Sequence, residues 1–128
     1  MTEGLDVFEY ATLRVVPRVE RGELINAGVV LYCRARGVVA ARTHLDEARL
    51  AALDPAADTT GVRAALAAVE RVCAGGDAAG QAAGDDAGRR FRWLIAPRST
   101  VVQPGPVHTG LTDDPVAEAD RLLHQLVL

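Results

Sequence analysis

The chain has 128 residues, of which 49% are apolar and 24% charged, and its formal net charge at pH 7 is −3. This length and composition are typical of a globular domain that folds without disulfides or metals. All 14 basic residues are arginine, and the lack of lysine excludes P-loop nucleotide-binding proteins, Schiff-base enzymes and protein kinases. The acidic balance argues against nucleic acid as a partner, because affinity for phosphates comes largely from positive charge.

Three strands are predicted in the first third of the chain. Residues 7–17 and 24–34 are rich in β-branched and aromatic residues. The second run is apolar at nearly every position, which is typical of a central strand covered on both faces. Gly37 offers a positive φ for a short turn, after which residues 38–42 return as a third strand. We therefore expect an antiparallel meander.

Two helices are predicted next. Residues 46–53 form a short helix that ends before Pro55. The second helix has one apolar face, with spacings of four, three and three between its members, Val62, Leu66, Val69 and Val72. Thr60 is its expected N-cap, and Gly75 with Gly76 is its expected end.

The segment 75–88 contains only Gly, Ala, Asp and Gln, and we expect a flexible loop, because nothing in it can anchor to a core. Residues 89–96 continue as a helix or a short strand. Val101 and Val102 indicate a brief strand before the Pro-Gly-Pro run at 104–106. A last helix follows residue 114, with Asp114 as its cap and Pro115 at its first position, and it is expected to cover the sheet.

These elements predict one α+β domain over residues 1–128, in which helices pack on a small antiparallel sheet of three to four strands. No apolar run is long enough to cross a bilayer and the first residues do not resemble a signal peptide, so we expect a cytoplasmic protein. Cys33 and Cys73 match no zinc motif and are expected to be reduced and buried. We expect no cofactor.

The connection between the first two predicted strands is one candidate site. Its polar residues are Arg18, Glu20, Arg21, Glu23 and Asn26. Alternating charges of this kind form either a solvated connection with weak surface ion pairs or a binding loop. Asn26 favours binding, because an amide at the mouth of a buried strand needs a hydrogen-bond partner.

A second candidate lies in residues 98–110, where prolines and glycines fix the shape of the chain between polar side chains. The residues concerned are Arg98, Ser99, Gln103, His108 and Thr109. They form either a ligand- or partner-binding segment or an ordered crossover whose hydroxyl groups satisfy the backbone. No nucleophile context accompanies His108, and the three histidines lack the spacing of metal ligands. Neither hydrolase chemistry nor a metal site is therefore expected.

The segment Arg89–Arg98 places four arginines beside Phe91 and Trp93. Arginines next to aromatic rings can bind phosphates and stacked bases. The other interpretation is that the aromatic side chains lie in the core and the arginines extend from it to solvent. We predict that Trp93 is a core residue, since the only tryptophan of a small domain usually is.

Three stretches, YATLRVVPRVERGELINAGVVLYC (10–33), FRWLIAPRSTVVQPGPVHTG (91–110) and DPVAEADRLLHQLV (114–127), resemble the bacterial family called domain of unknown function 3037. The matching residues are Arg18, Glu20, Arg21, Gly22, Glu23, Asn26, Gly28, Arg92, Trp93, Arg98, Ser99, Gln103, His108, Thr109 and Gly110. The family has no established activity. The resemblance implies a partner role, because relatives are often encoded beside a kinase-like protein similar to the toxin kinases of persistence systems.

Three functional hypotheses follow. The leading one is a non-enzymatic accessory or interaction domain, with a kinase-like protein of toxin–antitoxin type as its partner. The alternative is a small enzyme or a nucleotide- or anion-binding module, in which Arg21, Arg98 and His108 converge in one pocket. Nucleic-acid binding through Arg89–Arg98 ranks third. The alanine-rich helices would also allow a homodimer.

Overall fold

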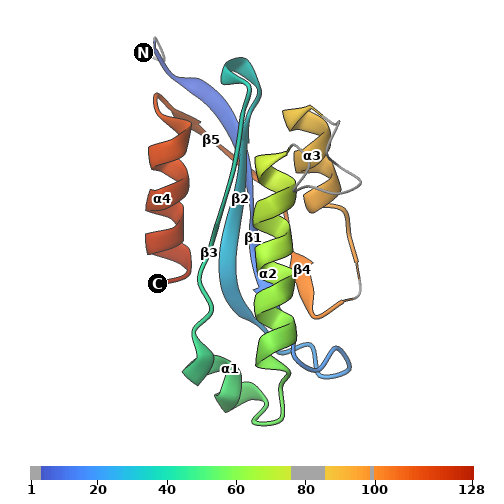
Figure 1. Cartoon of the computed structure of the whole chain (residues 1–128). Coiled ribbons are helices and arrows are strands. Elements are labelled where there is room, and N and C mark those ends of the chain that lie inside the picture. Colours follow the sequence, from blue (N-terminus) through green and yellow to red (C-terminus); the bar gives the residue numbers. More distant parts are fainter. Residues whose placement is uncertain (1–3, 76–85, 99) are drawn as a thin grey trace.

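The computed structural model describes residues 4–75, 86–98 and 100–128. Its strands are β1 (Asp6–Val15), β2 (Ile25–Cys33), β3 (Val38–Thr43), β4 (Val102–Pro104) and β5 (His108–Thr112). Its α-helices are α1 (Glu47–Leu53), α2 (Thr59–Ala74), α3 (Ala87–Leu94) and α4 (Pro115–Leu126), and a short 3-10 turn, Arg34–Arg36, joins β2 to β3. The predicted α+β class is confirmed (Figure 1).

The sheet is antiparallel, and β2 lies between β3 and β1. The other edge of β1 is shared, because β4 pairs with residues 13–15 of β1 and β5 with residues 6–10. Between these two pairings the chain from β4 to β5 contains three residues, 105–107. β1 contains only two residues over the same stretch. β4 and β5 therefore form one edge strand that is interrupted by a single extra residue. The predicted meander is confirmed, whereas β5 was missed.

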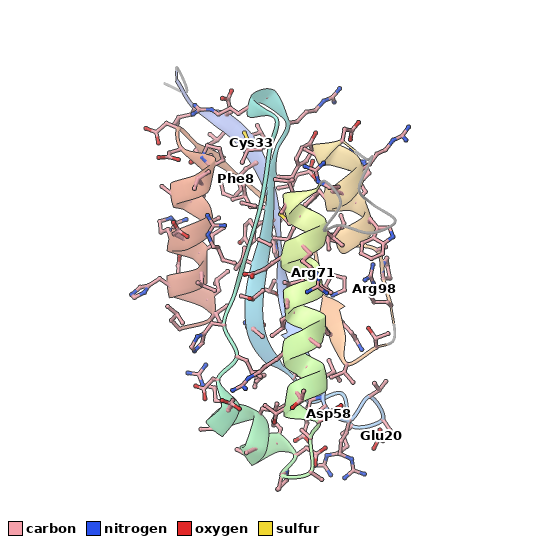
Figure 2. All side chains as sticks on the ribbon, in the orientation of Figure 1. Phe8, Glu20, Cys33, Asp58, Arg71 and Arg98 are labelled. Carbon is pink, nitrogen blue, oxygen red and sulfur yellow. The ribbon has the colours of Figure 1, made fainter. Side chains whose placement is uncertain are left out.

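Helices cover both faces of the sheet. Val30 and Tyr32 of β2 pack against α2 and α3, whereas Val29 and Leu31 pack against α4. Figure 1 shows α4 on one side of the sheet and α2 with α3 on the other, and Phe8 lies under α4 (Figure 2). Because side chains alternate along a strand, a strand covered in this way is apolar at successive positions. This confirms the prediction that residues 24–34 form a central strand.

The boundaries of α2 differ in part from the prediction. Its N-cap is Asp58, whose carboxylate accepts a hydrogen bond from the backbone N–H of Gly61 at 2.9 Å. The prediction of Thr60 as N-cap was wrong, because the helix begins at Thr59 and Asp58 already occupies the capping position. Gly75 ends the helix with a φ of 73°, as predicted.

The Ala/Gly-rich segment 75–88 was expected to be one flexible loop. Residues 76–85 lie outside the described residues. Asp86 is the N-cap of α3 and accepts a hydrogen bond from the backbone N–H of Arg89 at 2.8 Å, and α3 begins at Ala87. For residues 86–88 the prediction was therefore wrong, since an aspartate in this position is a helix start signal.

The C-terminal helix α4 follows the prediction. Asp114 accepts a hydrogen bond from the backbone N–H of Ala117 at 3.1 Å, and Pro115 occupies the first turn. Ala119 and Leu122 are buried against the sheet.

The two cysteines are free thiols and both are buried. Cys33 packs on the α4 face of the sheet, whereas Cys73 of α2 packs on the opposite face. Because the sheet separates them, the fold keeps both as buried apolar residues. None of the helices in the described part of the chain has the length and apolar character needed to span a membrane.

Candidate functional site

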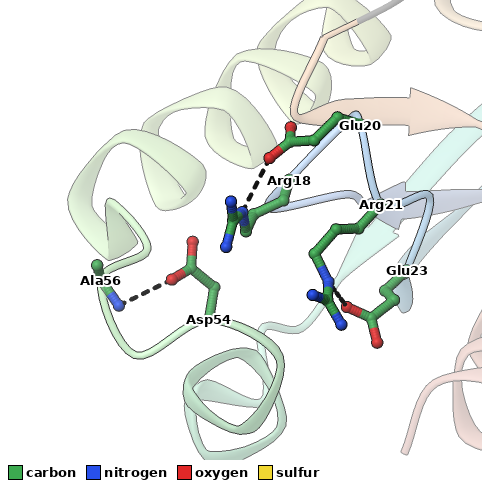
Figure 3. A network of polar contacts seen from close by, with 6 residues as sticks. All are labelled: Arg18, Glu20, Arg21, Glu23, Asp54 and Ala56. Carbon is green, nitrogen blue, oxygen red and sulfur yellow. Dashed lines mark hydrogen bonds and ion pairs between the residues drawn. The ribbon is translucent and has the colours of Figure 1, made fainter.

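The β1–β2 connection carries four charges that pair with one another. Arg18 Nε donates to Glu20 at 2.9 Å, and Arg21 Nε donates to Glu23 at 2.6 Å (Figure 3). The hydrogen bond from Arg21 lowers the pKa of the Glu23 carboxyl and raises the pKa of Arg21 in turn. Gly22, with a φ of 69°, closes the turn that sets up this pairing. All four charges are therefore balanced within the loop.

Asn26 lies at the start of β2, where its side-chain amide donates to the backbone oxygen of Leu126 at 3.3 Å. This bond ties β2 to the last turn of α4. The partner expected for a buried amide is thus the protein's own backbone.

The connection meets the second candidate segment at one point. The backbone N–H of Val16 donates to the carbonyl oxygen of Val101 at 2.7 Å, next to the pairing of Val15 with Val102. The start of the 18–26 segment therefore lies beside the start of β4. The remainder of the 98–110 segment follows β1 away from this point.

Trp93 is the main departure from the sequence prediction. Phe91 and Leu94 of α3 are buried in the core, and Phe91 stacks on Tyr32 with ring centroids 5.4 Å apart. Trp93 is 46% exposed, so the prediction of a core tryptophan was wrong. The spacing explains this, because residues 91 and 94 share a helix face and residue 93 points elsewhere. A large aromatic side chain is therefore presented to solvent.

Arg98 is held over this tryptophan. Its guanidinium carbon lies 4.9 Å from the centroid of the Trp93 ring, within the range of a cation–π contact. The same guanidinium donates to the backbone oxygens of Trp93 at 2.5 Å and Ala96 at 3.3 Å. These three contacts fix the arginine on the α2/α3 side of the sheet (Figure 2).

Beside Trp93 runs an apolar groove, which we call the α2 groove. One part, of about 390 Å³, lies at the start of α2, and a second, of about 410 Å³, reaches Trp93 and Arg98. Both parts are lined by Ala65 and Val101, so they adjoin. The other lining residues of the second part are Ala68, Val69, Val72, Thr100 and Val102. The groove thus combines small apolar walls with a tryptophan and an arginine at one end and with Asp54 and Asp58 at the other.

The remaining predicted residues lie elsewhere. His108 is directly across from Tyr10 in the β1–β5 pairing, and their rings are 5.4 Å apart on the α4 face. Gln103 donates to the backbone oxygen of Thr100 at 2.7 Å, and Thr109 is exposed on β5. Ser99 lies outside the described residues.

The structure does not bring Arg21, Arg98 and His108 together. Arg98 stands on the α2/α3 face and His108 on the α4 face, while Arg21 is paired within the β1–β2 loop. A pocket formed by all three is therefore incompatible with the described geometry.

The arginines of the segment Arg89–Arg98 also differ in their exposure to solvent. Arg89 and Arg92 are exposed on α3, whereas Arg90 is partly buried and donates to the backbone oxygen of Cys73 at 3.3 Å. Within the described ranges, His, Cys, Asp and Glu side chains form no group of three that could hold a metal ion.

Arg14 of β1 was missed by the sequence reasoning, which looked for functional residues in loops. Its Nε is buried and has no hydrogen-bond partner among the described residues. A buried donor left unpaired costs roughly 1–3 kcal/mol. The signal was present in the alternation of residues 10–15, which places Tyr10, Thr12 and Arg14 on one face of the strand.

Fold and site together define a small α+β domain with an apolar, tryptophan-bearing groove. A family model described as protein of unknown function (DUF3037) matches residues 10–127, and the chain belongs to this family. Searches of curated proteins and of solved structures found no match.

Proposed function

We propose that this protein is a non-enzymatic interaction domain that binds a protein partner through the α2 groove. The observation that carries the proposal is the 46% exposure of Trp93 at the end of an apolar groove. Tryptophan and arginine are the residue types most enriched at the energetic centres of protein interfaces. The family resemblance supports a kinase-like protein of toxin–antitoxin type as the first partner to test.

The contacts of Arg98 favour tight association. Binding normally costs free energy for immobilising long side chains, about 0.5–1.5 kcal/mol each. Arg98 is already held by the Trp93 ring and two backbone oxygens. Binding therefore costs less free energy for immobilising this side chain. The alanines of α2 keep the groove wall low, which lets a partner's apolar side chains approach the helix.

The other hypotheses have less support. An enzyme or anion-binding module built on Arg21, Arg98 and His108 lacks a common site for the three groups. Nucleic-acid binding would rest on the exposed Arg89 and Arg92 next to Trp93, against a net charge of −3. We further propose that the protein is bacterial and cytoplasmic, and two buried free thiols are compatible with a reducing compartment.

Co-purification with the kinase-like neighbour tests the proposal. The tagged protein is co-expressed with that neighbour, and Trp93→Ala is compared with Val116→Ala. Val116 is a matched control, because it is also 46% exposed but lies on α4, across the sheet from the groove. We expect wild type and Val116→Ala to retain a stoichiometric complex and Trp93→Ala to lose it. Equal recovery with all three proteins, or no complex with wild type, would contradict the proposal.

A further inference from the structure

Part of the α4 face of the sheet is polar and is not covered by the helix. α4 packs chiefly on β2 and β3. Beyond it, along β1, lie Thr12 and Arg14, both only partly buried. This surface is on the opposite side of the sheet from the α2 groove.

Arg14 is fixed in the middle of this surface. A Cβ added to Gly105 would lie 2.9 Å from Arg14 Nε and 2.7 Å from Thr12 Oγ1, so the side chain rests against the glycine backbone. Gly105 is itself anchored by a hydrogen bond from its N–H to the carbonyl oxygen of Thr12 at 2.8 Å. Nε is thereby covered by protein, whereas the two terminal nitrogens have no hydrogen-bond partner in the described ranges and are not fully buried. The end of the guanidinium thus faces outward.

No carboxylate among the described residues forms an ion pair with Arg14. Seven ion pairs in the described parts of the chain engage seven other arginines. The cross-strand neighbours of Arg14 are Asn26 on β2 and Gln103 on β4, both uncharged amides. Each amide is anchored to a backbone oxygen elsewhere, so both flank the arginine in fixed positions. Arg14 therefore differs from the ion-paired arginines in that its neighbours hold it in place without neutralising its charge.

We propose that Arg14 forms a binding site for a carboxylate group. The two terminal nitrogens of a guanidinium match the two oxygens of a carboxylate in a bidentate pair. One positive charge balances one carboxylate, whereas a phosphate dianion would call for further cations. The carboxylate comes either from a small organic acid or from an Asp or Glu side chain of another protein, and the same contact serves both.

The guanidinium can be observed directly by NMR, through the Nε–Hε signal of Arg14 in ¹⁵N-labelled protein. The probes are sodium acetate, a short end-blocked peptide with one glutamate, the same peptide with glutamine, inorganic phosphate, and sodium chloride at equal ionic strength. We expect a saturable shift of the signal with acetate and with the glutamate peptide, and none with chloride or the glutamine peptide. Tighter binding of the glutamate peptide than of acetate assigns the site to a protein side chain, and the reverse assigns it to a small acid.

Two variants separate binding from folding. Arg14→Lys keeps the positive charge but loses the two terminal guanidinium nitrogens that form the bidentate pair. We expect it to bind the carboxylate about tenfold more weakly, which is about 1.4 kcal/mol. Gly105→Ala keeps Arg14 but displaces its guanidinium, and it should weaken binding as well. Far-UV circular dichroism confirms that both variants are folded. A signal that does not saturate with either carboxylate, tighter binding of phosphate than of acetate, or unchanged affinity in Arg14→Lys would overturn the proposal.

Discussion

Helix α3 has one buried and one exposed aromatic side chain, and replacing each with alanine gives a sharp test of this arrangement. Phe91 is fully buried and stacks on Tyr32, whereas Trp93 is 46% exposed. Removing a fully buried phenylalanine costs about 3–5 kcal/mol, because the cavity adds to the lost burial. Removing Trp93 loses roughly half of an aromatic side chain's burial, about 100 Å² or 2 kcal/mol, and this is an upper limit because unfolded chains already bury some surface.

Urea denaturation followed by circular dichroism measures both free energies of unfolding. We expect Phe91→Ala to lower the free energy of unfolding by about 1–3 kcal/mol more than Trp93→Ala does. In thermal melts this corresponds to a difference of about 4–12 °C, at about 4 °C per kcal/mol for a domain of this size. If Trp93→Ala destabilises the protein as much as Phe91→Ala, then Trp93 is a core residue and the groove as described does not exist.

Further predictions concern single positions in the core and at a helix start. Burial raises the pKa of Cys73 to about 11 from 9.0, so the unfolded chain ionises first. The free energy of unfolding should therefore fall by about 2–3 kcal/mol as the pH rises from about 9 to about 11. In urea titrations, Cys73→Ala should not show the fall in the free energy of unfolding that comes from the Cys73 thiol. An identical fall in wild type and Cys73→Ala would refute this prediction. Gly28→Ala should destabilise the protein by about 1–3 kcal/mol in urea, because its Cβ would lie 2.7 Å from the Arg42 carbonyl oxygen in the adjacent strand. Asp58→Ala should cost about 1 kcal/mol by the loss of the α2 N-cap, and Asp58→Asn should restore most of it.

The central strand and the start of α4 could be predicted from sequence, because each is set by local chemistry. β2 is apolar on both faces, and Asp114 with Pro115 marks the start of α4. β5 could not be predicted in this way. Gly110 looks like a loop residue, yet a Cβ there would lie 2.6 Å from the Phe8 ring, so the strand requires a glycine for packing.

The candidate site was only partly accessible to sequence reasoning. Both Arg98 and Trp93 were predicted to matter, but Trp93 was expected in the core because of its residue type. Helix periodicity, which places residue 93 away from residues 91 and 94, would have predicted an exposed tryptophan and therefore a groove beside it. Arg14 was overlooked because functional residues were sought in loops, whereas it lies within a strand. The separation of Arg98 from His108 depends on which face of the sheet each occupies, and this follows from the register of β4 and β5 on β1.

The most direct test of the central claim follows Trp93 itself. Because the chain has one tryptophan, labelling with 5-fluorotryptophan gives a single ¹⁹F signal, and its accessibility can be measured with a soluble paramagnetic agent. We predict that adding the kinase-like protein proposed as the partner, in unlabelled form, shifts this signal and protects it from the paramagnetic agent, as expected when an exposed ring becomes buried in an interface. A complex that forms while the signal keeps both its position and its accessibility would show that the α2 groove is not the binding surface.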